Sequence, residues 1–175
     1  VGRRAGFLQA PVDAHRLHAV VRAEFPAQVV AGDEGAQARM EGLDVIVLEV
    51  DLDECLPVAG VFLDVDTIDA LVVPGGTVNA DHLRTDERAQ TLARKVAAAG
   101  KPLAVICHGP WLLVSAGLVE GRRLTSWPSL QDDIRNAGGQ WVDAEVVVDR
   151  NLVTSRKPDD VPAFVAALEK LLAAS

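Results

Sequence analysis

Two short apolar runs in the second half of the chain constrain its fold most strongly. The first run covers residues 69–73 and the second covers residues 103–106. Each is followed by a glycine-containing turn and then by a segment with the apolar spacing of a helix. Strands that are apolar on both faces are typical of a parallel sheet with helices on both sides. We therefore predict one α/β domain with a mainly parallel central sheet. In such folds the ligand site lies beyond the carboxyl ends of the strands.

Apolar runs and helical spacing also predict the remaining elements. A continuous helix is expected over residues 85–99, with Thr85 as its N-cap and Gly100 as its C-terminal stop. Extended segments are expected at residues 5–9, 28–31, 43–50 and 61–63, and a hairpin at 146–148 and 152–154. Further helices are expected over residues 14–25, 108–116, 128–137 and 159–172.

Charge and cysteine content exclude several classes of protein. The 175 residues include 17 basic and 25 acidic side chains, a formal net charge of −8, which argues against nucleic acid or anionic membrane as a partner. No apolar run approaches the roughly 18 residues that span a bilayer. Two cysteines make no disulfide framework, and the start of the sequence has no secretory pattern, so we expect a cytoplasmic protein.

Cys107 is the residue that most strongly indicates chemistry. The segment Ala104-Val-Ile-Cys-His-Gly-Pro110 places it between a buried strand and a helix. At a helix start, the dipole and the unpaired backbone N–H groups stabilise a thiolate, which is the nucleophilic form of cysteine. The placement resembles the nucleophile elbow of hydrolases. An inert core cysteine is the alternative, and it is the expectation for Cys55, whose other interpretation is a resolving thiol.

Several groups are candidates to act with this thiol. His108 can serve as a base only if another group holds it, and Asp81 and His82 follow the glycine turn at the same sheet edge. A surface histidine is the alternative for His82. The backbone amides of Gly75 and Gly76 could stabilise an oxyanion, although the pair also suits a simple tight turn. No cluster has the spacing of metal ligands, so we expect neither metal nor cofactor.

Four segments resemble those of a known family in order and spacing. They are Asp69-Ala-Leu-Val-Val-Pro-Gly-Gly76, Gly100-Lys-Pro-Leu-Ala-Val-Ile-Cys-His-Gly-Pro-Trp111, Leu124-Thr-Ser-Trp-Pro-Ser129 and Val153-Thr-Ser-Arg-Lys-Pro-Asp-Asp160. The family is the PfpI-type intracellular proteases, in the superfamily of the Parkinson-associated protein deglycase. The resemblance covers about residues 68–172. It implies a flavodoxin-like three-layer sandwich of the class I glutamine amidotransferase type, assembled as dimers or hexamers.

The resemblance also implies roles for individual residues. Cys107 would be the nucleophile and His108 its histidine, while Asp81 would complete the triad from a loop of the neighbouring subunit. Trp111 and Trp127 are expected near the site or the subunit interface, with core packing as the alternative. The N-terminal third, about residues 1–65, departs from the family pattern, because the glutamate expected after the first strand is absent. In this stretch Asp13 is the only nearby acid.

The resemblance and the residues together favour a cysteine-dependent enzyme that attacks an electrophilic carbonyl. Activities attributed to the family are peptide hydrolysis, deglycation of glyoxal or methylglyoxal adducts, cofactor-free glyoxalase activity and holdase chaperoning. We expect small carbonyl compounds or glycated or peptide substrates. The sequence argues against a glutamine amidotransferase, because that relative needs a histidine and an acid well downstream of the cysteine and no histidine follows His108. The alternative is a non-catalytic stress protein, a holdase or redox sensor in which Cys107 is oxidised.

Overall fold

The fold is built on a central, mainly parallel sheet. The structure is a computed structural model that describes residues 18–21, 45–49 and 65–174. In these ranges the sheet contains β1 (His18–Val21), β2 (Val45–Glu49), β3 (Ala70–Val73), β4 (Leu103–Ile106), β7 (Val146–Asp149) and β8 (Leu152–Ser155). Their order across the sheet is β1-β2-β3-β4-β8-β7. The four central strands are parallel, and β1 and β7 pair antiparallel at the two edges, so the predicted sheet is confirmed.

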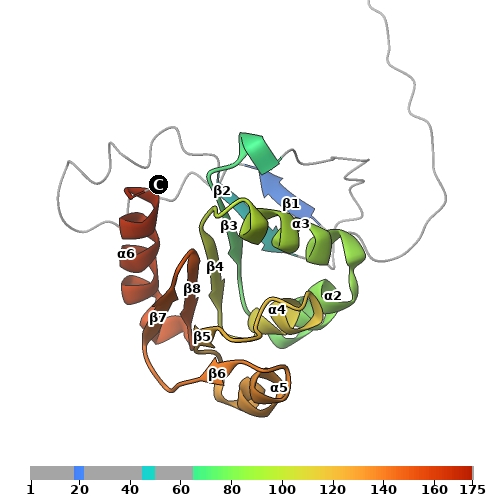
Figure 1. Cartoon of the computed structure of the whole chain (residues 1–175), viewed down its shortest axis with the longest axis vertical. Coiled ribbons are helices and arrows are strands. Elements are labelled where there is room, and N and C mark those ends of the chain that lie inside the picture. Colours follow the sequence, from blue (N-terminus) through green and yellow to red (C-terminus); the bar gives the residue numbers. More distant parts are fainter. Residues whose placement is uncertain (1–17, 22–44, 50–64, 175) are drawn as a thin grey trace, which may run out of the picture.

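Helices cover both faces of this sheet. They are α2 (Thr77–Thr85), α3 (Glu87–Ala98), α4 (Pro110–Ser115), α5 (Gln131–Asn136) and α6 (Val161–Leu172), with short 3-10 turns η1 (Val65–Thr67), η2 (Pro128–Leu130) and η3 (Pro158–Asp160). Figure 1 shows α2, α3 and α4 on one side of the sheet and α6 on the other, which gives three layers. A small parallel pair, β5 (Arg123–Leu124) and β6 (Gln140–Trp141), lies beside α5. This pair was not predicted from the sequence.

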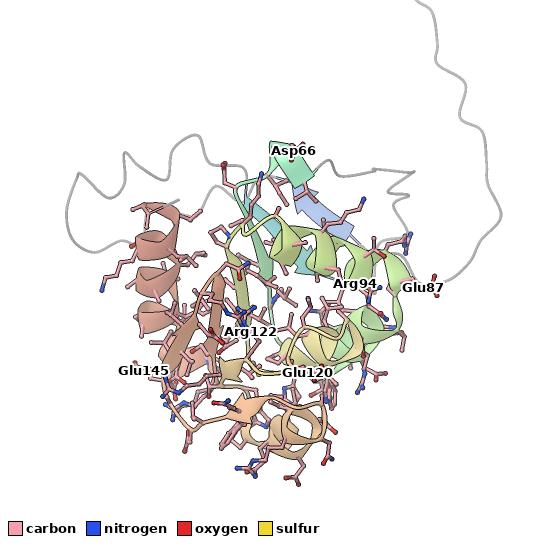
Figure 2. The ribbon with its side chains drawn as sticks, viewed as in Figure 1. Asp66, Glu87, Arg94, Glu120, Arg122 and Glu145 are labelled. Atoms are coloured by element: carbon pink, nitrogen blue, oxygen red, sulfur yellow. The ribbon has the colours of Figure 1, made fainter. Side chains whose placement is uncertain are left out.

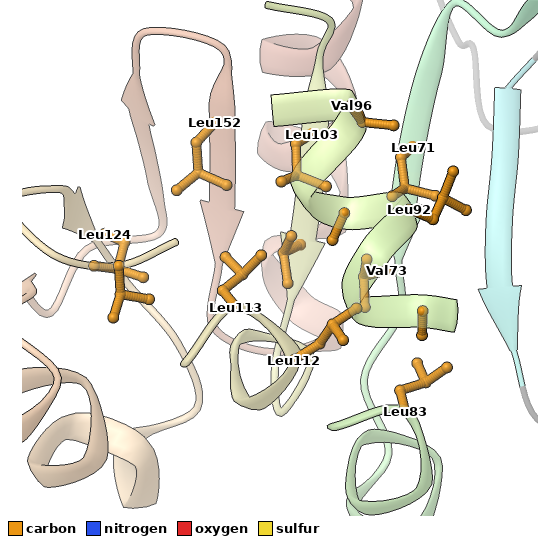
Figure 3. Packing of buried hydrophobic residues seen from close by; sticks show 14 of the residues in the cluster. Leu71, Val73, Leu83, Leu92, Val96, Leu103, Leu112, Leu113, Leu124 and Leu152 are labelled. Atoms are coloured by element: carbon orange, nitrogen blue, oxygen red, sulfur yellow. The ribbon is translucent and has the colours of Figure 1, made fainter. Parts of the chain in front are cut away.

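Side chains of β3, β4 and β8 alternate between two apolar layers, as the pleat of a strand requires. The layer under α3 and α4, shown in Figure 3, contains Leu71, Val73, Leu103, Val105 and Leu152 from the strands and Leu92, Val96, Leu112 and Leu113 from the helices. The opposite layer contains Ala70, Val72, Ala104 and Val153, which pack with Phe164 and Leu168 of α6. Burial on both faces explains why these strands are continuous apolar runs.

The predicted helix over residues 14–25 is wrong where the structure describes it. Residues His18–Val21 form β1, which pairs antiparallel with β2. Adjacent β-branched residues at Val20 and Val21 favour an extended backbone, and the edge of β2 supplies the hydrogen-bonding partner. The predicted segments at 5–9, 28–31 and 61–63 lie outside the described residues, as does Cys55.

The helix predicted over residues 85–99 is α3, and Thr85, its predicted N-cap, is instead the last residue of α2. α2 ends at Thr85, whose hydroxyl donates to the carbonyl of His82 at 3.0 Å. Asp86 is the N-cap of α3, because its carboxylate accepts from the backbone N–H groups of Arg88 and Ala89. Aspartate is a stronger N-cap than threonine, so the helix begins one residue later than expected. The helix α2 itself, with its few apolar residues, was missed.

The later elements agree with the sequence more closely. Gly100 follows α3 with φ +72, the left-handed conformation that ends helices at glycine. The helix expected from residue 108 begins at Pro110, and those expected over 128–137 and 159–172 each open with a 3-10 turn. The β7–β8 hairpin is present. Arg122, labelled in Figure 2, donates to the carbonyl of Asp149 at 2.6 Å at the end of β7.

Candidate functional site

Cys107 directly follows β4 and has a left-handed backbone conformation. Its φ is +63, which costs a non-glycine residue about 1–2 kcal/mol. Hydrogen bonds on both sides hold it there: its N–H donates to the Ser155 carbonyl at 3.0 Å, and its own carbonyl accepts from the Trp127 N–H at 2.8 Å. A strained residue fixed by its surroundings is typical of functional sites. The half-buried side chain therefore has a defined position at the carboxyl edge of the sheet.

The cysteine and the adjacent histidine contact each other. The Sγ atom of Cys107 lies 3.3 Å from Nδ1 of His108. Side chains of adjacent residues usually point in different directions, but the sharp turn at Cys107 brings these two together. Burial lowers the pKa of His108 below its ordinary value, so the ring is neutral at neutral pH and Nδ1 can accept the thiol proton. Within the described part of the chain, no carboxylate is hydrogen bonded to His108.

Two tryptophans enclose the imidazole of His108. Trp127 stacks on it, with ring centroids 5.7 Å apart and planes inclined by 24°. Trp111 meets it edge-on, with centroids 5.6 Å apart and planes at 63°. Trp111 is itself fixed, because its indole N–H donates to Asp133 at 2.8 Å and the guanidinium of Arg84 lies 5.2 Å from its ring centroid. Both predicted aromatic residues therefore lie beside the histidine.

The glycine turn after β3 lies against the thiol. A Cβ atom added at Gly75 would be 2.5 Å from the Cβ of Cys107 and 3.0 Å from its Sγ, so only glycine fits without a shift. Gly76 has φ +85 and is the N-cap residue of α2. Asn79 donates to the Gly75 carbonyl at 3.2 Å and ties the turn to the first turn of α2.

Of the two predicted acids, the structure describes only Asp81. Asp81 was expected in a loop, but the segment after the glycine turn is helix α2, and its side chain is exposed on that helix. Within one copy of the chain, Asp81 is not hydrogen bonded to His108. Asp13 lies outside the described residues. His82, in the same helix, is half-buried.

Buried hydroxyl groups support the site, and sequence reasoning gave them no role. The Thr154 hydroxyl accepts from the backbone N–H of Thr125 at 2.9 Å. The Ser126 hydroxyl donates to the Trp127 carbonyl and accepts from the indole N–H of Trp141, both at 2.9 Å. These bonds fix the loop that reaches Cys107. In the sequence, this role could have been inferred from the polar residues of segments 124–129 and 153–160, two of the segments that resemble the known family.

An ion-pair network fixes the chain after β8. Arg156 donates to both carboxylate oxygens of the buried Asp160, at 2.8 and 3.1 Å, and to Asp143 at 2.7 Å. The hydrogen bond from Arg156 holds the pKa of Asp160 below its ordinary value. This network follows directly on Ser155, whose carbonyl receives the Cys107 N–H.

Two kinds of feature are absent from the described residues. These residues hold no group of three or more histidine, cysteine, aspartate or glutamate side chains that could bind a metal ion. None of their helices combines the length and the apolar composition needed to cross a membrane.

Comparison with known proteins identifies the family. A deglycase of Pyrococcus abyssi is 43% identical over 162 residues, covering 90% of this chain and 87% of that protein. The protein/nucleic acid deglycase 2 of Escherichia coli is 39% identical over 169 residues, covering 94% of this chain and 89% of that protein. The crystal structure of Drosophila melanogaster DJ-1beta matches with a TM-score of 0.59 and 32% identity, over 63% of this chain and 59% of that chain.

This chain therefore spans less than two thirds of the Drosophila melanogaster structure. The sequence pattern of the DJ-1/PfpI family matches residues 11–171, nearly the whole chain. The resemblance seen in four sequence segments is confirmed, and the chain belongs to the DJ-1/PfpI family.

Proposed function

We propose that this chain is a cysteine-dependent deglycase, a hydrolase that removes glyoxal or methylglyoxal adducts from amino groups. The observation that carries the proposal is the 3.3 Å contact between Cys107 Sγ and His108 Nδ1 on a strained turn. Relatives that are named deglycases and match nearly the full length of the chain support it.

The reaction begins with transfer of the thiol proton to His108. Neutral His108 accepts it at Nδ1, and the thiolate of Cys107 attacks the adduct carbon that carries the amine and a hydroxyl group. A C–S bond forms as the C–N bond breaks, and His108 gives its proton to the departing amine, which leaves a hemithioacetal on Cys107. His108 then moves a proton from this carbon to the adjacent carbonyl carbon through an enediolate, whose negative oxygen is stabilised by the backbone amides of Gly75, Gly76 and His108. The product is a thioester on Cys107, which water hydrolyses to the hydroxy acid and the free thiol. For a methylglyoxal adduct, the sum is adduct plus water giving free amine plus lactate.

Carbonyl adducts suit this site better than peptide bonds. A thiolate adds readily to an aldehyde or ketone carbon, whereas peptide hydrolysis requires a well-oriented acid to protonate a poor leaving group. In the described part of the chain, no carboxylate orients His108. Peptide hydrolysis is therefore the weaker candidate for this chain.

A second copy of the chain would supply the missing carboxylate in this proposal. Asp81 is exposed on α2, so it is open to contact with a neighbouring subunit. In such an assembly, a mixture of Cys107→Ala and Asp81→Ala subunits regains activity, because each mixed pair contains one intact site. If the mixture stays as inactive as its separate components while mixed oligomers form, Asp81 does not act across an interface.

A scavenger experiment tests whether the adduct itself is the substrate. A peptide carrying a preformed methylglyoxal adduct is purified, and its spontaneous dissociation rate is measured with excess aminoguanidine to trap the free aldehyde. A deglycase removes the adduct faster than this spontaneous rate. If adduct loss with the enzyme never exceeds the spontaneous rate, the deglycase proposal is wrong, and conversion of free methylglyoxal to lactate then separates a glyoxalase from a non-catalytic protein.

A non-catalytic stress protein is the second candidate. It is favoured by the lack of a carboxylate on His108 in the described residues, because a histidine that nothing orients is a weak base. Under this alternative, Cys107 is oxidised by peroxide but turns over neither adduct nor free aldehyde. Stoichiometric rather than catalytic loss of methylglyoxal would identify it.

A further inference from the structure

Trp127 contacts both members of the proposed catalytic pair. Its backbone N–H donates to the carbonyl of Cys107 at 2.8 Å, and its indole stacks on His108 with centroids 5.7 Å apart. The side chain is 38% exposed, so one part of the ring faces His108 while another faces solvent. A core-packing role alone does not account for a large aromatic ring placed in this way.

The loop that carries Trp127 is anchored independently of the ring. Ser126 is fully buried, and its hydroxyl joins the Trp127 carbonyl to the indole N–H of Trp141. Pro128, directly after Trp127, begins the 3-10 turn η2. The backbone at Trp127 is thus fixed by groups other than its own indole, which means that the indole can be replaced without releasing the loop.

We propose that Trp127 is the positioning residue of the Cys107–His108 pair: its indole holds the imidazole in the orientation that presents Nδ1 to the thiol. The ring torsion of histidine is broad and close to two-fold, so a free imidazole would often turn Nδ1 away. The stacked indole on one face and the edge of Trp111 restrict that rotation. This inference rests on the proposed function and adds a positioning residue to it.

The same contact sets the charge state of the histidine. Burial lowers the pKa of His108, and the indole of Trp127 covers one face of its ring. Within residues 65–174, Cys107 on the same turn contacts the imidazole, and Trp111, which meets its edge, contacts Arg84 and Asp133 in turn. Removing the indole exposes the ring, so the pKa of His108 should rise toward its ordinary value of about 6.5.

Two variants isolate the contribution of the ring. Trp127→Phe keeps an aromatic face against His108, whereas Trp127→Leu removes it. Both keep the backbone N–H that donates to Cys107. Because the side chain is 38% exposed, both are expected to fold, which circular dichroism and urea denaturation check. Trp127→Gln provides a second non-aromatic replacement should the leucine variant fail to fold.

The measurement is the rate at which iodoacetamide alkylates Cys107 as a function of pH. Mass spectrometry of the peptide that contains Cys107 distinguishes alkylation of Cys107 from alkylation of Cys55. In parallel, NMR of the ring protons of His108 follows the titration of its imidazole. In Trp127→Leu we expect alkylation near pH 7 to slow by about 10-fold or more, because a general base contributes about 100-fold or more. We also expect the profile to approach that of His108→Ala and the pKa of His108 to rise. Trp127→Phe should stay close to wild type.

Two results would overturn the inference. One is a wild-type alkylation profile and His108 titration in the non-aromatic variant. The other is equal loss in Trp127→Phe and Trp127→Leu, which would assign the effect to the shape of the loop. Alkylation of Cys107 does not require turnover. If the wild-type protein fails to remove adducts, the proposed function is refuted, but the alkylation rates still test whether Trp127 positions His108.

Discussion

Replacing Gly75 with alanine tests whether the glycine turn sets the position of the thiol. The added Cβ would lie 2.5 Å from the Cβ of Cys107 and 3.3 Å from the carbonyl oxygen of Ile106. Carbon atoms in contact prefer about 3.5–4.0 Å, so one of the two segments must move by about 1 Å. Overpacking of this kind costs about 1–3 kcal/mol of folding free energy.

The consequence for chemistry is larger than the consequence for stability. Cys107 Sγ lies 3.3 Å from His108 Nδ1, and a shift of about 1 Å in a reacting group can cost about 100-fold in rate. We therefore expect Gly75→Ala to stay folded at 25 °C while its Cys107-dependent turnover falls by about two orders of magnitude. Steady-state kinetics, the rate of Cys107 alkylation and urea denaturation measure the three quantities.

Gly100→Ala is the matched control. Gly100 has φ +72, and an added Cβ would meet nothing within 4 Å. Alanine there should cost about 1 kcal/mol through backbone strain, with no effect on the thiol. Equal stability losses but a rate loss only in Gly75→Ala would support the reasoning. Wild-type turnover and alkylation in Gly75→Ala would refute it.

Four further predictions concern stability, each measured by urea denaturation. Among the described residues, the buried Thr125 hydroxyl has no hydrogen-bond partner, so Thr125→Val should be neutral or stabilising. Thr154→Val should cost about 1–3 kcal/mol, because it leaves the buried Thr125 N–H unpaired; equal effects of the two changes would contradict this. Asp86→Ala removes the N-cap of α3 and should cost about 1 kcal/mol, and an unchanged stability would show that the cap is not needed. The pKa of Asp160 is lowered by Arg156, so its stabilisation is present above the ordinary value of about 3.9 and is lost as pH falls through the lower folded value. The stability difference between wild type and Asp160→Asn should therefore shrink from pH 7 to pH 2, and a constant difference would contradict the ion-pair account.

The sheet and the position of the cysteine were predictable because burial alone determines them. The runs at β3 and β4 are apolar on both faces, and only a strand covered by two helical layers satisfies that pattern. Glycine-containing turns after both strands then place Gly75 and Cys107 at one edge. These inferences depend on local sequence, which is why they agree with the structure.

The features that were missed depend on contacts between distant segments. Strand β1 forms because β2 offers a partner, and this overrides the helical spacing of its residues. The contact of His108 with Cys107 depends on a left-handed backbone that the Ser155 carbonyl and the Trp127 N–H hold in place. A side chain one residue away would otherwise point elsewhere. The resemblance to a nucleophile elbow indicated a sharp turn at Cys107, but no sequence pattern predicts the stacking of Trp127 on His108.

The most direct test of the account is the release of lactate from a methylglyoxal-modified peptide, compared between the wild-type chain and Cys107→Ala. Both proteins are first shown to have the same circular dichroism spectrum and urea midpoint within error. The account predicts multiple turnovers by the wild type, with free amine and lactate appearing in equal amounts, and no release above background by Cys107→Ala. Equal release by both proteins would contradict the central claim that Cys107 is the nucleophile of a deglycase.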